Sequence, residues 1–130
     1  MTAEGSRESA SEQLQLANEE PQASEQILRV GFPRIALSIA CSAVFHAVRG
    51  RLYAEGLEPR THEGLQHLWN VHLVKAGLYE PATSRLLSRL QKLREEADYA
   101  QAFVIDEPGA REEIQAARGL VERIRHELGT

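Results

Sequence analysis

The stretch PRIALSIACSAVFHAVRGRLYAEG, residues 33–56, decides the fold. Pro33 suits the first turn of a helix and Gly56 suits the residue just past its end, so we predict a helix from Pro33 to about Glu55. Three rows at helical spacing run along it: a row of small residues (Ala36, Ala40, Ala43, Ala47, Gly50, Ala54), an apolar row (Leu37, Cys41, Val44, Val48, Leu52) and a row that turns polar halfway (Ile35, Ile39, Ser42, His46, Arg49, Tyr53). We therefore expect a central helix that its neighbours nearly surround.

Outward from this helix, capping residues and apolar periodicity predict four more helices. We expect them at about residues 21–30, 61–77, 81–99 and 110–128, with a looser segment over residues 100–109. Thr61 is the N-cap candidate of the third helix, and Pro108-Gly109 is the expected break before the last one. The alternation of apolar and polar residues that is typical of strands is absent from the sequence. The predicted fold class is all-α, an up-and-down antiparallel bundle of about five helices.

The length and composition fit one domain of ordinary size. The chain has 130 residues, of which 42% are hydrophobic and 26% charged, which is enough apolar material for a compact core. Its first twenty residues are rich in Glu, Ser and Gln, and Leu14 and Leu16 are the only large apolar residues between Met1 and Pro21. We expect a flexible acidic segment over residues 1–20 and a helical bundle domain over residues 21–130.

Composition argues against several classes of protein. The stretch Ile35–Val48 contains Ser38, Ser42 and His46 and falls short of the roughly 18 apolar residues of a membrane span, so no membrane is expected. The N-terminus shows no basic head followed by an apolar run, as a secretory signal would. Cys41 is the only cysteine, which suits a cytoplasmic protein without an intrachain disulfide. No spacing typical of metal ligands occurs, so neither a metal nor another cofactor is predicted.

The net charge of −4 conceals an uneven distribution. Residues 1–26 hold six acids and one arginine, residues 29–94 hold ten basic residues and four acids, and residues 95–130 hold nine acids and four arginines. The basic middle favours an anionic partner such as a nucleotide or RNA. Ordinary solvated helix faces are the alternative interpretation.

Two pairs of basic residues are candidates for binding an anion. His46 and Arg49 lie three residues apart on one helix face, where an imidazole beside a guanidinium could bind a phosphate or move a proton. The alternative for His46 is a half-buried histidine that bonds a neighbouring helix. Arg60 and His62 stand at a predicted helix start, where backbone amides favour an anion, although a plain helix start explains them equally well.

The segment Leu93–Tyr99, LREEADY, carries a third candidate. Arg94 and Asp98 lie at i and i+4 and can pair, but such a pair stabilises a helix by only about 0.2–0.5 kcal/mol. A competing anion could therefore take Arg94, and Tyr99 closes the helix beside it. The alternative is a helix-ending ion pair followed by a packed tyrosine.

Four segments in this order resemble the HEPN family, whose name stands for higher eukaryotes and prokaryotes nucleotide-binding. Ala40–Arg49, ACSAVFHAVR, resembles the signature helix of that family. Gly56–His62, Val74–Gly77 and Leu93–Tyr99 resemble the segments that follow it. The resemblance covers about residues 22–128.

The resemblance implies a helical bundle that forms a homodimer. It also implies a nucleotide- or RNA-phosphate-binding module that is the partner subunit of a minimal nucleotidyltransferase in a toxin–antitoxin-type pair. The anion would be held by residues that match or flank the family segments: Arg94, Asp98, Tyr99, His62, Arg60, Arg49, His46 and Lys75.

Other family members are metal-independent ribonucleases, in which a histidine follows an arginine after a few residues. Here the residue five positions after Arg94 is Tyr99, and a tyrosine is a poor base near pH 7 because its ordinary pKa is about 10. We therefore expect a binding module in preference to an enzyme. The alternative is a metal-independent endoribonuclease in which folding or dimerisation brings His62 or His46 to Arg94.

Overall fold

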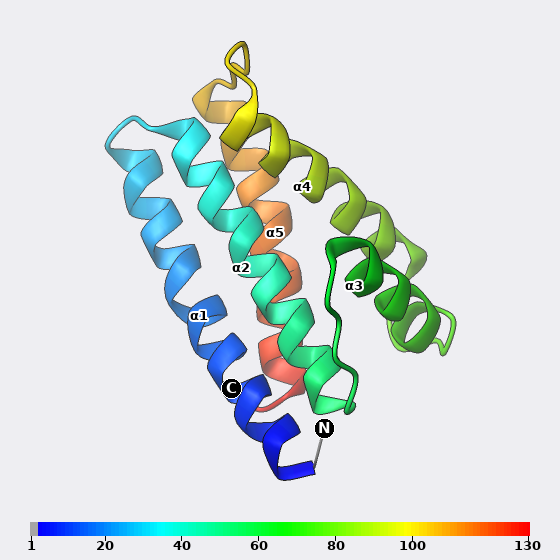
Figure 1. Cartoon of the computed structure of the whole chain (residues 1–130). Coiled ribbons are helices and arrows are strands. Elements are labelled where there is room, and N and C mark those ends of the chain that lie inside the picture. The colour runs from blue at the N-terminus through cyan, green and yellow to red at the C-terminus, as the bar shows by residue number, and fades with distance from the viewer. Residues whose placement is uncertain (1–2) are drawn as a thin grey trace.

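The computed structural model describes residues 3–130 and confirms the all-α bundle. Within these residues there is no strand, and the elements are α1 (Ala3–Arg29), α2 (Pro33–Ala54), α3 (His62–Trp69), the π-helical turn η1 (Asn70–Val74), α4 (Pro81–Tyr99) and α5 (Glu107–Glu127). Figure 1 shows that α1, α2, α4 and α5 run alternately up and down, while the short α3 lies to one side near α2 and α4.

Helix α2 is the centre of the bundle, as predicted. Its apolar row (Leu37, Cys41, Val44, Val48 and Leu52) has no exposed surface. Its row of small residues lets neighbouring helices come close: a Cβ atom added to Gly50 would lie 3.0 Å from Cγ of Leu14 in α1. The hydroxyl of Ser24, also in α1, donates a hydrogen bond of 2.6 Å to the carbonyl oxygen of Ala36.

Among the described residues, α2 is the one helix whose length and hydropathy suit a membrane span. Within the bundle, 67% of its most apolar window is buried. Core helices of globular domains have the same composition, because they too are surrounded by apolar neighbours.

Helix α1 begins much earlier than predicted. The expected start at Pro21 is wrong: the helix begins at Ala3, and Pro21 lies inside it. Proline removes one backbone hydrogen bond within a helix, but Ala10, Leu14 and Ala17 on the N-terminal side of it are buried. Few large side chains are needed here, because the facing surface of α2 consists of small residues. The division of the chain at residue 20 stays a prediction.

Two other helix boundaries differ from the sequence prediction. The third helix does not run regularly to Gly77: α3 ends at Trp69 and the π-helical turn η1 follows. Pro108-Gly109 is not a break, because α5 already begins at Glu107. Asp106 caps α5 by accepting a 2.8 Å hydrogen bond from the backbone amide of Gly109, so Pro108 stands in the first turn, where proline is tolerated. The predicted bounds of α2 and α4 agree closely with the structure.

Candidate functional site

A small polar cleft lies where the start of α3 meets the last turns of α4. Its volume is about 210 Å³, and its walls come from His62, Gln91, Arg94, Glu95, Asp98 and Tyr99. Four of the residues predicted to bind an anion, His62, Arg94, Asp98 and Tyr99, therefore line one cleft.

Arg94 is only loosely paired. Its Nε atom lies 3.6 Å from Oδ2 of Asp98, one turn further along α4, which is too long for a hydrogen bond. Every other arginine–carboxylate pair among residues 3–130 is 3.0 Å or shorter. Since the Arg94 side chain is also one-third exposed, an incoming anion can reach it.

Asp98 is held in place from α2. Its Oδ1 atom accepts a 2.5 Å hydrogen bond from the hydroxyl of Ser38. Arg34 lies one turn before Ser38 on the same side of α2, and it donates a 2.9 Å hydrogen bond to the carbonyl oxygen of Ala97 in α4. These two contacts fix the last turns of α4 against α2 and so position Arg94.

Ser38 and Arg34 were not predicted from the sequence as part of the site. Arg34, Ser38, Phe45 and Arg49 form a row at spacings of 4, 7 and 4 residues along α2, which brings them to one helix face. This row is visible in the sequence and could have indicated that Arg34 and Ser38 share a helix face with Arg49. Only the position of α4 shows that the row faces Asp98.

His62 enters the cleft as the first residue of α3. Thr61 caps that helix as predicted, by accepting a 2.9 Å hydrogen bond from the amide of Gly64. The His62 ring packs edge-on against Phe45, with ring centroids 5.3 Å apart. Partial burial lowers the pKa of His62 below its ordinary value, and the positive charges of Arg49 and Arg94 lower it further. A neutral imidazole with two guanidinium groups around it is thus placed at the cleft.

The remaining predicted residues lie elsewhere. His46 forms a hydrogen bond through Nδ1 with the carboxylate of Glu20 in α1, which agrees with the alternative interpretation of a half-buried histidine bonded to a neighbouring helix. Arg60 and Lys75 are exposed and are not among the residues that line the cleft. Arg49 is likewise absent from the lining, although its charge acts on His62.

Cys41 lies buried on the core side of α2. Burial raises the pKa of its thiol to about 12, and the charge of Arg94 offsets only part of this effect. The thiol is therefore protonated near pH 7 and serves packing. Within residues 3–130, no three His, Cys, Asp or Glu side chains come together in a way that could hold a metal ion.

Comparison with known proteins shows the family to which the chain belongs. The model of the HEPN domain matches residues 10–128. The candidate toxin MJ0605 of Methanocaldococcus jannaschii is 27% identical over 122 residues, which are 94% of this chain and 90% of that protein. The UPF0332 protein PH1297 of Pyrococcus horikoshii is 27% identical over 81 residues, 62% of this chain and 57% of that protein. Since the family model spans nearly the whole bundle, the chain belongs to the HEPN domain family.

Proposed function

We propose that the chain is a nucleotide- or RNA-phosphate-binding module. The observation that carries this proposal is the loose pairing of Arg94, whose Nε atom is 3.6 Å from Asp98. A phosphate oxygen that accepted hydrogen bonds from the guanidinium would form a stronger interaction than this exposed pair, because charge-assisted bidentate bonds exceed ordinary ones in strength. His62, Tyr99 and Gln91 offer further polar groups at the same cleft.

The module would act in a toxin–antitoxin-type pair in the cytoplasm, as the partner of a minimal nucleotidyltransferase. The name of the Methanocaldococcus relative supports the toxin assignment, and the family resemblance supports the partner. Co-expression of this chain with such a nucleotidyltransferase should give a complex that survives affinity purification, and calorimetry with millimolar ATP should show binding to the isolated chain. Failure to recover a complex would contradict the proposed partner. The absence of heat with ATP or GTP would contradict the proposed binding of a nucleotide.

A homodimer is part of the same proposal. Exposed apolar side chains gather at the end of the bundle where α1 joins α2: Val30, Phe32, Ile35, Tyr99 and Val104. Phe32, Ile35 and Val104 line one depression, and Arg34 and Phe103 line both it and the next one, which contains Asp98 and Tyr99. This apolar end is therefore continuous with the cleft, and we place the second copy of the chain on it.

Light scattering tests the dimer. The wild-type chain should have twice the monomer mass, and the double variant Phe32→Asp/Val104→Asp should be a folded monomer, because two buried charges are costly at an interface. Leu78→Asp is the matched control, since Leu78 is also exposed but lies in the turn before α4. A monomeric wild type, or a double variant that remains dimeric, would contradict this surface.

A second function is favoured by one specific observation: Arg94 and His62 line the same cleft within one chain. No histidine follows Arg94 within a few residues of the sequence, but His62 lines the same cleft as Arg94. The pair could act as a metal-independent endoribonuclease, with Arg94 holding the scissile phosphate and neutral His62 accepting the proton of the ribose hydroxyl. His46 is bonded to Glu20 and is not among the residues that line this cleft.

RNA cleavage in the presence of EDTA tests the second function. Arg94→Ala and His62→Ala should each abolish cleavage, whereas Arg85→Ala and His67→Ala, exposed residues of α4 and α3, should leave it unchanged. Equal cleavage by all five proteins would show that the activity comes from a contaminant.

A further inference from the structure

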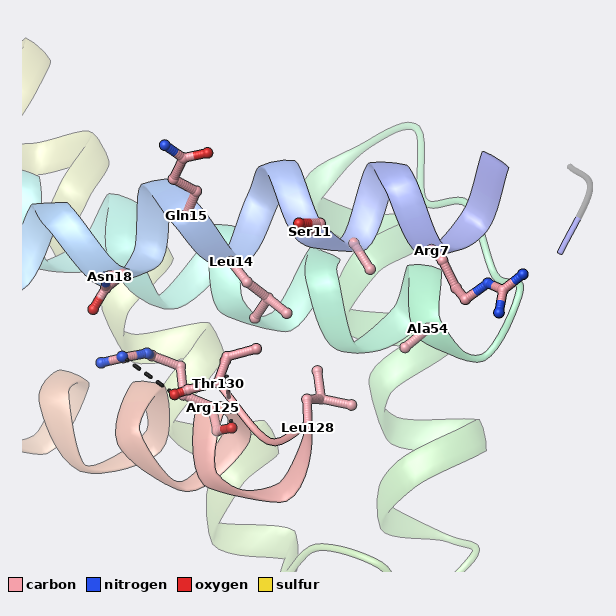
Figure 2. Close-up of a pocket in the computed structure, with 10 residues that line it drawn as sticks. Arg7, Ser11, Leu14, Gln15, Asn18, Ala54, Arg125, Leu128 and Thr130 are labelled. Carbon is pink, nitrogen blue, oxygen red and sulfur yellow. Dashed lines mark hydrogen bonds between the residues drawn. The ribbon is translucent and has the colours of Figure 1, made fainter. Parts of the chain in front are cut away.

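A second, larger cavity lies between the N-terminal half of α1 and the last turns of α5. Its volume is about 550 Å³, and the residues that line it do not overlap with those of the cleft. Figure 2 shows Leu14 of α1 and Leu128 near the end of α5 projecting into the gap between the two helices. Ala10 and Ala54 complete an apolar floor.

Two arginines, Arg7 and Arg125, reach this cavity, and none of the described side chains that line it is acidic. The Nε atom of Arg125 is buried and has no hydrogen-bond partner among residues 3–130. Its Nη2 atom makes only a 3.4 Å contact with the backbone oxygen of Thr130. Arg7 forms no ion pair with any residue that the structure describes.

Within residues 3–130, the acids on the neighbouring turns of α1 and α5 form no ion pair with either arginine. Glu127 accepts a 2.7 Å hydrogen bond from Nε of Arg51, and Glu4, Glu8 and Glu12 are exposed and do not line the cavity. The cationic groups of the cavity therefore lack a carboxylate side chain as counter-ion among the described residues. A buried donor without an acceptor destabilises the folded protein, and more so when it is charged, so an anion that reached Arg125 would relieve this cost.

We propose that this cavity binds a small apolar molecule that carries one anionic group. The apolar body would lie against Leu14, Ala10 and Leu128, and the anionic group would accept hydrogen bonds from Arg125, with Arg7 as a second charge nearby. The volume falls in the range of small-molecule sites, about 300–1,000 Å³, and apolar walls with a few convergent polar groups are typical of such sites. This site is separate from the proposed phosphate cleft and does not depend on it.

Two fluorescent probes of similar shape test the proposal on the full chain. 8-Anilinonaphthalene-1-sulfonate carries an anionic group, and N-phenyl-1-naphthylamine is its uncharged counterpart. The anionic probe should bind with one-to-one stoichiometry and about tenfold more tightly than the neutral one, as expected if a charged hydrogen bond contributes to binding. Arg125→Gln should remove most of this preference.

Two further variants separate this cavity from other apolar surfaces. Ser11→Trp, an exposed position of α1 that lines the cavity, should fill it and block both probes. Arg29→Gln, at an exposed position outside the cavity on the same helix, should leave both affinities unchanged. Circular dichroism melts identify any variant that fails to fold. If Arg125→Gln does not fold, Arg7→Gln takes its place, and we expect it to lose less of the preference for the anionic probe. The proposal is overturned if the two probes bind alike, or if Ser11→Trp and Arg125→Gln bind the anionic probe as well as the wild type does.

Discussion

At the scale of single residues, His62 and Arg94 offer complementary groups to an anion. Arg94 provides a permanent charge, while His62 is neutral near pH 7 because partial burial, Arg49 and Arg94 all lower its pKa. A bound phosphate would bring negative charge close to the imidazole and so raise that pKa again. Binding and protonation of His62 are therefore linked.

This linkage predicts a pH dependence of binding. The affinity for a dinucleotide, whose phosphodiester does not titrate in this range, should rise as the pH falls through the His62 pKa, because the bound state takes up a proton. Calorimetry between about pH 8 and pH 5.5 measures the slope. His62→Gln should remove the slope and His67→Gln should keep it. An unchanged slope in His62→Gln would mean that another group is responsible.

In the ligand-free protein, the pH dependence of stability has the opposite sign: stability decreases as the pH falls, whereas affinity increases. The folded state holds the His62 pKa below that of the unfolded chain, so the unfolded chain takes up the proton more readily. The His62 contribution to stability is therefore present above the ordinary histidine pKa and decreases as the pH falls below it.

At the scale of elements, α2 acts through two opposite faces. The face toward α1 is made of small residues and allows close contact, as at Gly50 and Leu14. The face toward α3 and α4 carries Ser38 and Phe45, which hold Asp98 and the His62 ring. The same helix thus both closes the core and positions the cleft.

Gly50→Leu tests the contact between α1 and α2. A larger side chain would collide with Leu14, so we expect the free energy of unfolding to fall by about 1–3 kcal/mol, the usual cost of overpacking a core. Gly119→Leu is the matched control: Gly119 lies in α5, and a Cβ atom added there would meet nothing within 4 Å. This change should raise stability by up to about 1 kcal/mol. Chemical denaturation measures both, and equal effects of the two variants would contradict the close packing.

Helix ends were predictable from sequence where the signal is local. Pro33, Thr61 and Pro81 each start a helix near the expected position, since proline geometry and side-chain capping act within one turn. The start of α1 was not predictable in this way, because Ala10 and Ala17 are buried by packing against other helices, which a local pattern does not show. Arg94 and Asp98 were found from their spacing, but the contact made by Ser38 was missed and the sequence left two interpretations of His46 open. Their partners, Asp98 and Glu20, lie 60 and 26 residues away in the sequence.

At the scale of the whole molecule, the acidic segment over residues 1–20 packs against the bundle for much of its length. Ala10, Leu14 and Ala17 are buried, while Glu4, Glu8, Glu12 and Glu19 are exposed. Much of the negative charge of the first 26 residues thus lies on the outside of α1, whereas Arg94 of the cleft lies in α4. In the cleft the charges are mixed, because Glu95 and Asp98 line it together with Arg94.

Removal of residues 2–20 tests the predicted division of the chain at residue 20. We expect the melting temperature to fall by on the order of 10 °C, because truncation uncovers the small-residue face of α2. Leu14→Ala should lower the stability by about 2 kcal/mol or more, and Leu16→Ala, which is exposed, by less than about 0.5 kcal/mol. An unchanged melting temperature of the truncated chain would support the division.

The central claim is that the cleft binds phosphate through Arg94, and titration calorimetry with ATP tests it most directly. Arg94→Gln removes the charge and keeps a polar side chain, and Arg85→Gln makes the same change at an exposed position of the same helix. Loss of a charged hydrogen bond should weaken ATP binding by Arg94→Gln about tenfold or more, whereas Arg85→Gln should bind as the wild type does. Equal affinity of Arg94→Gln and the wild type would contradict the account.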